Sequence, residues 1–183
     1  AENRESVWLY ENSGSNNQPL FSLVKKNFMQ DQMIDVGAGA YPVLHDYDKD
    51  GLPDLFIGNY GLLDSTYYSF GYLYFIYKSS ITLYRNTGTA GQPEFEFVTD
   101  DYASMSSLRR TGLYPAFADL DGDGDDDMLL GCTDGSIIFC ENIAGTGNLP
   151  EYAQPVLNFQ GIDVGGSSTP QLIDLNNDGL TDL

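Results

Sequence analysis

Short apolar runs bounded by turn residues recur along the chain and predict its secondary structure. The runs are rich in Val, Ile, Leu, Phe and Tyr, and they are separated by Gly, Asn, Asp and Pro. No segment carries the apolar stripe of a capped helix, so the pattern predicts an all-β chain. The predicted strands lie within residues 7–10, 41–46, 55–58, 95–99, 114–119, 128–131, 136–141 and 169–174.

Two sequence markers recur in step, which indicates an internal repeat. The first is a strand of the form Pro-x-apolar-x-Asp, and the second is a strand end with Asn, followed by Gly and later by Pro. From the Asn of one marker to the Asp of the next, the three distances are 34, 33 and 32 residues. Such spacing is typical of a repeated supersecondary unit whose loops vary in length. The pairs are Asn12 and Asp46, Asn86 and Asp119, and Asn142 and Asp174.

Four antiparallel strands in each repeat predict the blades of a β-propeller. We expect one partial propeller over residues 1–183, with about three blades' worth of strands. Closed propellers typically have 4 to 8 blades, so the remaining blades of its own propeller are an expected partner. The expected parts are a trailing half-blade at 1–40, a blade at 41–113 with an aromatic insert at 60–80, a blade at 114–168, and the start of the next blade at 169–183.

The composition is strongly acidic. The chain has 27 Asp and Glu against 8 Lys and Arg, a formal charge of −19. This charge repels nucleic-acid backbones and anionic membranes, so neither is expected as a partner. No apolar run approaches the roughly 18 to 20 residues that span a bilayer, and no direct membrane insertion is expected. Cations are the natural counterparts of such a chain.

Three acidic loops of the form D-x-[DN]-x-D-G-x-x-D follow the Pro-x-apolar-x-Asp strands. Carboxylates at alternate positions crowd like charges into one turn, which favours a hard cation among them. Calcium accepts 6 to 8 oxygen ligands, and no loop contains the His or Cys that zinc prefers. The expected ligands, with position 7 acting through its carbonyl, are Asp46, Asp48, Asp50, Leu52 and Asp54 in loop 1; Asp119, Asp121, Asp123, Asp125 and Asp127 in loop 2; and Asp174, Asn176, Asp178, Leu180 and Asp182 in loop 3.

The residues around the loops distinguish between known calcium motifs. An EF-hand requires an acidic residue at position 12, whereas that position is Ile57 in loop 1 and Leu130 in loop 2. The pattern instead resembles the FG-GAP and VCBS repeats of integrin-α-like β-propellers, in which a Pro-x-Phe-x-Asp strand, the acidic loop and a Leu-apolar-apolar-Gly strand follow one another. The resemblance covers residues 41–58, 114–142 and 169–183 closely, and residues 7–21 as a trailing half-repeat.

This resemblance implies three Ca²⁺ sites that staple the first hairpin of each blade in a ring of about seven blades. It also suggests a secreted bacterial surface protein, with adhesion or ligand binding as its role. Calcium sites on extracellular modules have Kd values on the order of 10⁻⁴ to 10⁻³ M, which suits an extracellular location. The alternative is the propeller portion of a carbohydrate-active enzyme, a polysaccharide lyase or hydrolase, whose catalytic residues lie outside this chain.

The insert at 60–80 is unusually aromatic and is the candidate surface for a protein or glycan ligand at the cell surface. Aromatic side chains offer large contact areas at low entropic cost. The alternative is a long hairpin that packs on its own blade or on a neighbouring domain. The residues singled out for ligand contact are Tyr67, Tyr68, Phe70, Tyr72 and Tyr74.

The other residues with notable chemistry have simpler interpretations. His45 precedes a ligand position on a strand, and we expect a structural role. Arg109 and Arg110 suit a solvated surface pair, with binding of an acidic ligand as the alternative. A hairpin closing on Asp134 and Gly135 would pair Cys132 with Ile137 and Cys140 with Leu129. The two sulfurs would then lie on opposite faces, so two free thiols are expected.

No set of residues assembles a catalytic site in the sequence. The chain has one His, no G-x-S-x-G motif and no Gly-rich phosphate-binding loop. Most of the well-placed carboxylates are assigned to metal. We therefore expect this chain not to be an enzyme.

Overall fold

The computed structural model describes residues 8–26 and 33–183, in two units formed by residues 1–35 and 36–183. In the first unit, β1 (Leu9–Asn12) pairs antiparallel with β2 (Phe21–Lys25). The strand predicted at 7–10 is therefore present, although Val7 lies outside the described residues. The predicted trailing half-blade at 1–40 includes further residues that are not described, and it stays a prediction.

The first sheet of the second unit has the four strands predicted for a blade. Its order is β3 (Tyr41–His45), β4 (Asp54–Gly58), β7 (Ile81–Asn86) and β8 (Phe95–Thr99), and all neighbours are antiparallel. Loop 1 joins β3 to β4, which places the acidic residues at one end of the sheet. β7 and β8 continue the meander, because each pairs antiparallel with the strand that precedes it in this sheet.

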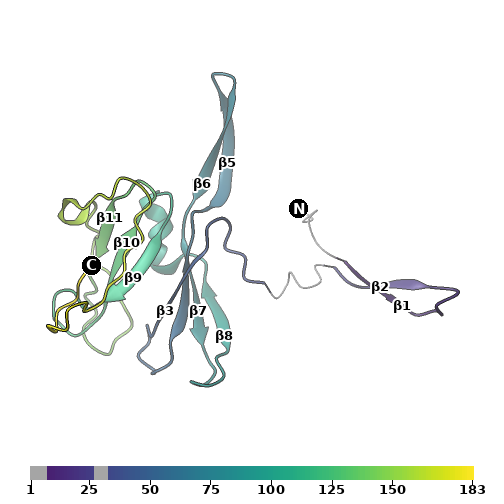
Figure 1. The fold of residues 1–183 in the computed structure, drawn as a ribbon, viewed down its shortest axis with the longest axis horizontal. Helices are drawn as coiled ribbons and strands as arrows, with labels where there is room; N and C mark the ends of the chain where they lie inside the picture. Colours follow the sequence, from purple (N-terminus) through teal and green to yellow (C-terminus); the bar gives the residue numbers. More distant parts are fainter. Residues whose placement is uncertain (1–7, 27–32) are drawn as a thin grey trace. The chain divides into compact units, whose positions relative to one another are not determined.

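The aromatic insert forms a separate hairpin between β4 and β7. β5 (Leu62–Ser69) pairs with β6 (Tyr72–Lys78), with a register shift between Leu63 and Ser65. At the tip, Phe70 and Gly71 have φ values of 48° and 82°, which permits the tight turn between the strands. Figure 1 shows the hairpin projecting away from the four-stranded sheet.

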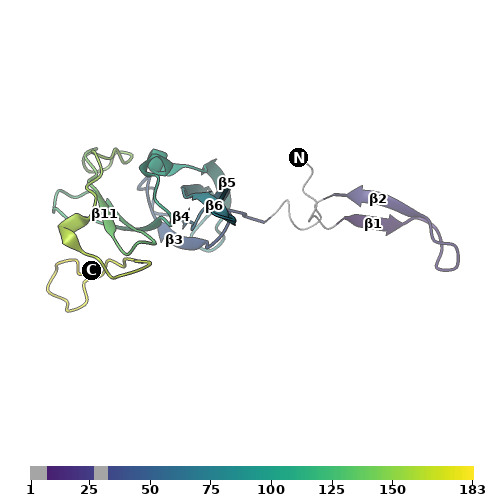
Figure 2. The same ribbon diagram turned by 90° about the horizontal axis from the view of Figure 1, so that it is seen from above.

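The second sheet contains β9 (Tyr114–Ala118), β10 (Asp127–Gly131) and β11 (Ile137–Cys140). The fourth position of this blade is represented by isolated bridges, Phe139 with Val156 and Asn142 with Tyr152. Loop 2 joins β9 to β10 as loop 1 joins β3 to β4. Figures 1 and 2 both show this sheet beside the first. The all-β prediction of antiparallel blades is confirmed.

The remaining segments are short and connect or follow the two sheets. The described residues include two 3₁₀ elements, η2 (Tyr102–Leu108) between the sheets and η3 (Phe159–Gly161) after the second. Residues 169–183 form one bridge, Ile173 with Asp182, across loop 3. The third repeat therefore has the same hairpin connection as the others in a shorter form.

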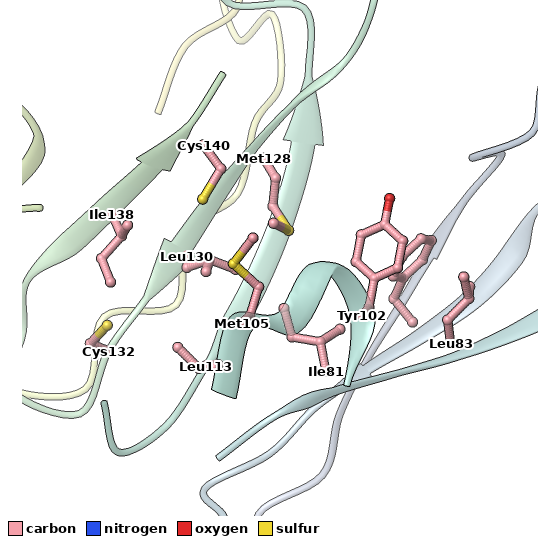
Figure 3. Close-up of a cluster of buried hydrophobic side chains, with 11 residues drawn as sticks. Ile81, Leu83, Tyr102, Met105, Leu113, Met128, Leu130, Cys132, Ile138 and Cys140 are labelled. Atoms are coloured by element: carbon pink, nitrogen blue, oxygen red, sulfur yellow. The ribbon is translucent and has the colours of Figure 1, made fainter. Parts of the chain in front are cut away.

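The apolar core of the second unit lies between the two sheets. Phe56, Ile81 and Leu83 contribute from the first sheet and Met128, Leu130 and Ile138 from the second, all nearly inaccessible to solvent. Full burial of such side chains is worth about 1.5 to 3 kcal/mol each. Figure 3 shows that Tyr102, Met105 and Leu113 of the connecting segment complete the cluster. Each blade thus depends on its neighbour for a buried face.

Equivalent glycines mark where one repeat packs against the next. A Cβ atom on Gly58 would lie 2.0 Å from the carbonyl oxygen of Leu113, and one on Gly131 would lie 2.1 Å from that of Ser168. Both glycines end the second strand of a repeat, and both carbonyls directly precede the first strand or segment of the following repeat. The close backbone approach explains the Gly of the Leu-apolar-apolar-Gly pattern. It also shows that residues 169–183 follow the second sheet as the second sheet follows the first.

The register of the β10–β11 hairpin differs by one residue from the prediction. Cys140 pairs with Met128 and not Leu129, and the backbone N–H of Cys132 donates to the carbonyl of Ser136 and not Ile137. The two cysteines therefore lie on the same face and both join the core, so their predicted placement on opposite faces is wrong (Figure 3). The loop between the paired residues Cys132 and Ser136 therefore holds residues 133–135, one residue fewer than the predicted loop at 133–136. Both thiols are nevertheless free, as expected.

Candidate metal centre

Loop 1 is folded by hydrogen bonds from its own backbone to its carboxylates. The two oxygens of Asp46 accept the N–H groups of Asp50 and Gly51 at 3.1 and 2.9 Å. Asp48 accepts the N–H of Asp50 at 3.3 Å, and Asp50 accepts that of Leu52 at 2.9 Å. These bonds turn the three side chains inward, and one oxygen from each lies within 4.8 Å of the others.

Loop 2 repeats this arrangement in the second sheet. Asp119 accepts the N–H groups of Gly122 and Gly124 at 2.7 and 3.0 Å. Asp121 and Asp123 accept the N–H groups two residues further on, at 3.1 and 3.0 Å. Oxygens of Asp119, Asp121 and Asp123 again converge within 4.8 Å. The two loops bring the same three aspartates together although their sequences differ at four of nine positions, and one bond differs, because the first aspartate accepts the N–H of position 5 in loop 1 and of position 4 in loop 2.

Loop 3 has the same backbone bonds with one changed ligand. Asp174 accepts the N–H groups of Asp178 and Gly179 at 3.1 and 2.9 Å, as Asp46 does in loop 1. At position 3, Asn176 accepts the N–H of Asp178 at 2.9 Å and donates its amide to Asp178 Oδ2 at 3.0 Å. An amide nitrogen is no ligand for a cation, so Asn176 must turn its oxygen inward to coordinate one. Loop 3 is therefore the weakest of the three candidates.

The position-9 aspartates connect the loops to the sheets. Asp54 is fully buried, and its oxygens accept the N–H groups of Tyr47 and Asn86 at 3.1 and 2.7 Å. Asp127 accepts those of Leu120 and Asn142 at 3.1 and 2.8 Å, and Asp182 accepts that of Leu175 at 2.9 Å. Burial raises the pKa of both Asp54 and Asp127. These side chains fix the turn and each remains an expected metal ligand.

Position 7 supplies an observation that points directly to a ligand in loop 2. Asp125 stands where loops 1 and 3 have Leu52 and Leu180, and its side chain is only 3% exposed. One of its oxygens accepts the N–H of Gly145 at 2.7 Å, whereas the other, Oδ1, is buried without a hydrogen-bond partner among the described residues. Burial and the neighbouring carboxylate of Asp123 raise the pKa of Asp125. A buried carboxylate oxygen without a donor is costly unless a cation satisfies it.

Among the described residues, basic side chains contact loops 1 and 2. Arg85 Nε lies 2.6 Å from Asp48 Oδ2, and its Nη2 lies 3.3 Å from Asp50 Oδ2. Lys49 reaches across to Asp126 of loop 2 and so connects the two blades. No local pattern in the sequence indicates the Arg85 contact, because Asp50 lies 35 residues away along the chain. Glu141 occupies the equivalent position before the Asn of the second repeat.

The asparagines of the second marker have a role that the sequence analysis did not assign. Asn86 Oδ1 accepts the N–H groups of Gly88 and Glu94 at 3.1 and 3.2 Å, and its amide donates to the carbonyl of Pro53 in loop 1. Asn142 makes the same set of bonds with Ala144, Glu151 and Asp126, and Asn12 the first two with Gly14 and Leu20. Each Asn closes a turn, and in the two sheets it also holds the acidic loop. Its recurrence before a Gly and a later Pro was the available signal.

The other predicted site residues are surface or packing residues. His45 stacks on Phe117, with ring centroids 4.3 Å apart, and this confirms its structural role. The aromatic residues of the hairpin are exposed, so packing of the insert on its own blade is wrong: Tyr68, Phe70 and Tyr72 are 74%, 96% and 70% exposed. Tyr67 and Tyr74 stack on each other with centroids 5.0 Å apart. The hairpin thus presents a row of rings to solvent.

The residues of the loops fit a hard divalent cation. All converging ligand atoms are carboxylate oxygens, and the sharp turn at Gly51 and Gly124, with φ of 90° and 92°, leaves room for them to surround one point. Oxygen-only donor sets of this kind suit Ca²⁺, which accepts irregular geometry, better than Mg²⁺ or Zn²⁺. The unpartnered oxygen of Asp125 adds a donor that such an ion would use.

Comparison with known proteins supports the repeat that the sequence and the structure both show. No curated protein and no solved structure shows significant similarity to the chain. Among the described residues, no helix is both long and apolar enough to cross a membrane. The FG-GAP-like repeat family matches residues 46–130 and again residues 119–183, and each match begins at the first aspartate of an acidic loop. Because these matches cover well over half of the sequence and coincide with the structural repeats, the chain belongs to the FG-GAP-like repeat family.

Proposed function

We propose that the three acidic loops bind Ca²⁺ and that the ions stabilise the first hairpin of each repeat. The observation that carries this proposal is the convergence of three carboxylates in loop 1 and three in loop 2, where the first aspartate of each loop accepts the N–H of the glycine at position 6. Three like charges within 4.8 Å of one another repel unless a cation lies between them. The role of the metal is structural, because the loops join strands whose other ends pack in the core.

The module that these ions stabilise is proposed to be non-catalytic and to bind a protein or glycan ligand. The support is the exposed aromatic hairpin, since apolar surfaces of this kind are commonly interaction sites. Large rings held on a two-stranded scaffold lose little entropy when they contact a partner. An extracellular location follows from the calcium proposal, because calcium is millimolar there and loops of this type bind it with Kd on the order of 10⁻⁴ to 10⁻³ M. Adhesion at a cell surface is the role that fits these properties.

Calcium titration of EDTA-treated protein tests the metal proposal. We expect calorimetry to give three sites and the melting temperature to rise with calcium, with magnesium producing a much smaller change. At calcium concentrations near 100 times Kd, one site adds about 2.7 kcal/mol to the free energy of unfolding. A protein that neither binds calcium nor gains stability from it would leave the loops as acidic turns and overturn the proposal.

Matched variants assign the sites. Asp121→Asn should remove one binding event, because Asp121 provides one of the three converging oxygens of loop 2. Asp100→Asn removes the same charge at an exposed position outside the loops and should leave the stoichiometry at three. Equal effects from both variants would mean that calcium responds only to the overall charge.

A further inference from the structure

A cavity of about 770 Å³ lies where the base of the aromatic hairpin meets the end of η2. One wall is formed by Tyr60, Phe75 and Tyr77, and the other by the segment from Ser106 to Thr111. The volume falls within the range of about 300 to 1,000 Å³ that small-ligand sites occupy. The cavity belongs wholly to the second unit and is separate from the acidic loops.

The framework of this cavity is held by buried hydrogen bonds. The Ser79 hydroxyl donates to the carbonyl of Tyr60 and accepts the N–H of Gly112 at 2.8 Å. The N–H of Leu113 donates to the carbonyl of Asn59 at 3.0 Å. These bonds join the base of the hairpin to the strand that enters the second sheet. The two walls are therefore fixed before any ligand arrives, which lowers the cost of binding.

The cavity concentrates positive charge in a chain that has little of it. Three of the 8 Lys and Arg residues line it, namely Lys78, Arg109 and Arg110, against a single carboxylate, Asp64. Arg110 Nη1 lies 2.9 Å from Asp134 Oδ2, which orients its guanidinium. In the part of the chain that the structure describes, neither Lys78 nor Arg109 has a carboxylate at ion-pair distance. The chain has 27 acidic residues, and two cations of one cavity that have no carboxylate partner among the described residues indicate an anionic ligand.

The opposite wall defines the rest of the ligand. The rings of Tyr60 and Tyr77 meet edge to face, with centroids 5.2 Å apart, and Phe75 extends the apolar surface. A pyranose ring has apolar C–H faces that pack on aromatic rings, and a uronic acid adds a carboxylate at the ring edge. Arginine binds carboxylates through two parallel hydrogen bonds. An acidic sugar therefore matches both walls at once.

We propose that this cavity binds an acidic saccharide, with Arg109 and Arg110 holding its carboxylate and Tyr60 and Tyr77 packing against the sugar ring. This inference rests on the proposed role as a ligand-binding module and names the chemistry of the ligand. It does not depend on calcium in the loops, because no loop residue lines the cavity.

The test is NMR titration of the calcium-saturated protein with a disaccharide that contains glucuronic acid, and with its neutral glucose counterpart. We expect shifts in the amides of residues 106–111 and 75–79 with the acidic sugar, and affinity at least about tenfold lower for the neutral one. Arg109→Gln and Arg110→Gln should each lower the affinity for the acidic sugar by about tenfold or more. Lys25→Gln removes the same charge from the first unit and should change it less than about twofold.

Each contrary result has a definite meaning. Equal affinity for the two sugars, or unchanged affinity in the Arg109→Gln/Arg110→Gln double variant, would overturn the inference. A short glutamate peptide that binds these residues more tightly than the sugar would also overturn it, while leaving a ligand-binding module. A protein that binds three calcium ions but no sugar would overturn the saccharide proposal alone. A protein that binds neither calcium nor sugar would overturn the proposed function as well.

Discussion

At the scale of single residues, buried side chains hold turns and loops in place through hydrogen bonds. The asparagine that ends the third strand is the clearest case, because its amide and its backbone N–H bind two different turns. Asn86 is 3% exposed and connects the turn before β8 with loop 1. A buried amide that makes three hydrogen bonds stabilises the fold mainly because its loss leaves several partners unsatisfied.

Asn86→Ala should therefore lower the free energy of unfolding by about 2 to 4 kcal/mol. The substitution leaves the N–H groups of Gly88 and Glu94 and the carbonyl of Pro53 without their partner. Urea unfolding of the calcium-saturated protein measures the change. Gln154→Ala, at an exposed position, is the control and should change stability by less than about 0.5 kcal/mol. A similar small loss for both variants would show that solvent replaces the amide of Asn86.

The two cysteines are also best understood as individual packing residues. Both are buried in the core, and burial raises the pKa of the Cys140 thiol to about 12. A thiol with this pKa is almost entirely protonated at neutral pH and is a poor nucleophile. Both side chains pack in the core as small apolar groups.

At the scale of elements, the same loop occurs three times with different charge. Loop 2 contains six aspartates, including Asp125 with its unpartnered oxygen, whereas loop 3 contains three and replaces one ligand by Asn176. Loop 1 is intermediate, and Arg85 already compensates part of its charge. Because affinity for calcium follows ligand charge and site rigidity, loop 2 should bind most tightly and loop 3 most weakly.

Arg85→Gln should raise the calcium affinity of loop 1 by about three- to tenfold, because a positive charge beside Asp48 competes with the ion. The amide signals of Gly51, Gly124 and Gly179, one in each loop, allow NMR to follow the three sites separately. Lys78→Gln removes the same charge from the hairpin and should leave all three affinities unchanged. Weaker binding at Gly51 in the Arg85 variant would instead mean that the guanidinium organises the loop for the metal.

At the scale of the whole molecule, the core between the two sheets contains the residues that stabilise the second unit, and the β5–β6 hairpin lies outside this core. The central cluster draws on β4, β7, β10, β11 and the connecting segment, and it includes no residue of the β5–β6 hairpin. A two-stranded hairpin exposed on both faces adds little stability of its own. Its exposed aromatic residues therefore fit the ligand-binding role that we propose for it.

Replacement of residues 61–78 by Asp-Gly, the turn of residues 134 and 135, should therefore preserve the fold. We expect the free energy of unfolding to change by less than about 1 kcal/mol, which corresponds to a melting temperature within about 4 °C of the parent chain. Differential scanning calorimetry in calcium measures this. The matched variant Leu130→Ala, in the core, should lose about 2 to 5 kcal/mol. A hairpin deletion as damaging as Leu130→Ala would place the insert within the folding unit.

The sequence by itself determined the all-β class, the repeat and the position of every acidic loop, because these follow from local patterns. Alternation of apolar residues predicts strands, and Asp and Gly at fixed spacing predict the turn between β3 and β4 or β9 and β10. The strand predicted at 95–99 coincides with β8 for the same reason. Prediction from local pattern failed where one residue of register mattered, at Cys132 and Cys140, since either register satisfies the same turn residues.

Only the tertiary structure decided which distant residues meet. Arg85 contacts loop 1 from a strand more than thirty residues away, and the cavity beside Arg109 is lined by two distant segments. The burial of the Asp125 oxygen without a partner also depends on how the chain packs around it. Their geometry depends on how the two sheets and the insert pack, and packing is fixed by the summed contacts of many side chains. No spacing of residues in the sequence encodes such contacts, whereas the loops encode their own turn and so could be recognised at once.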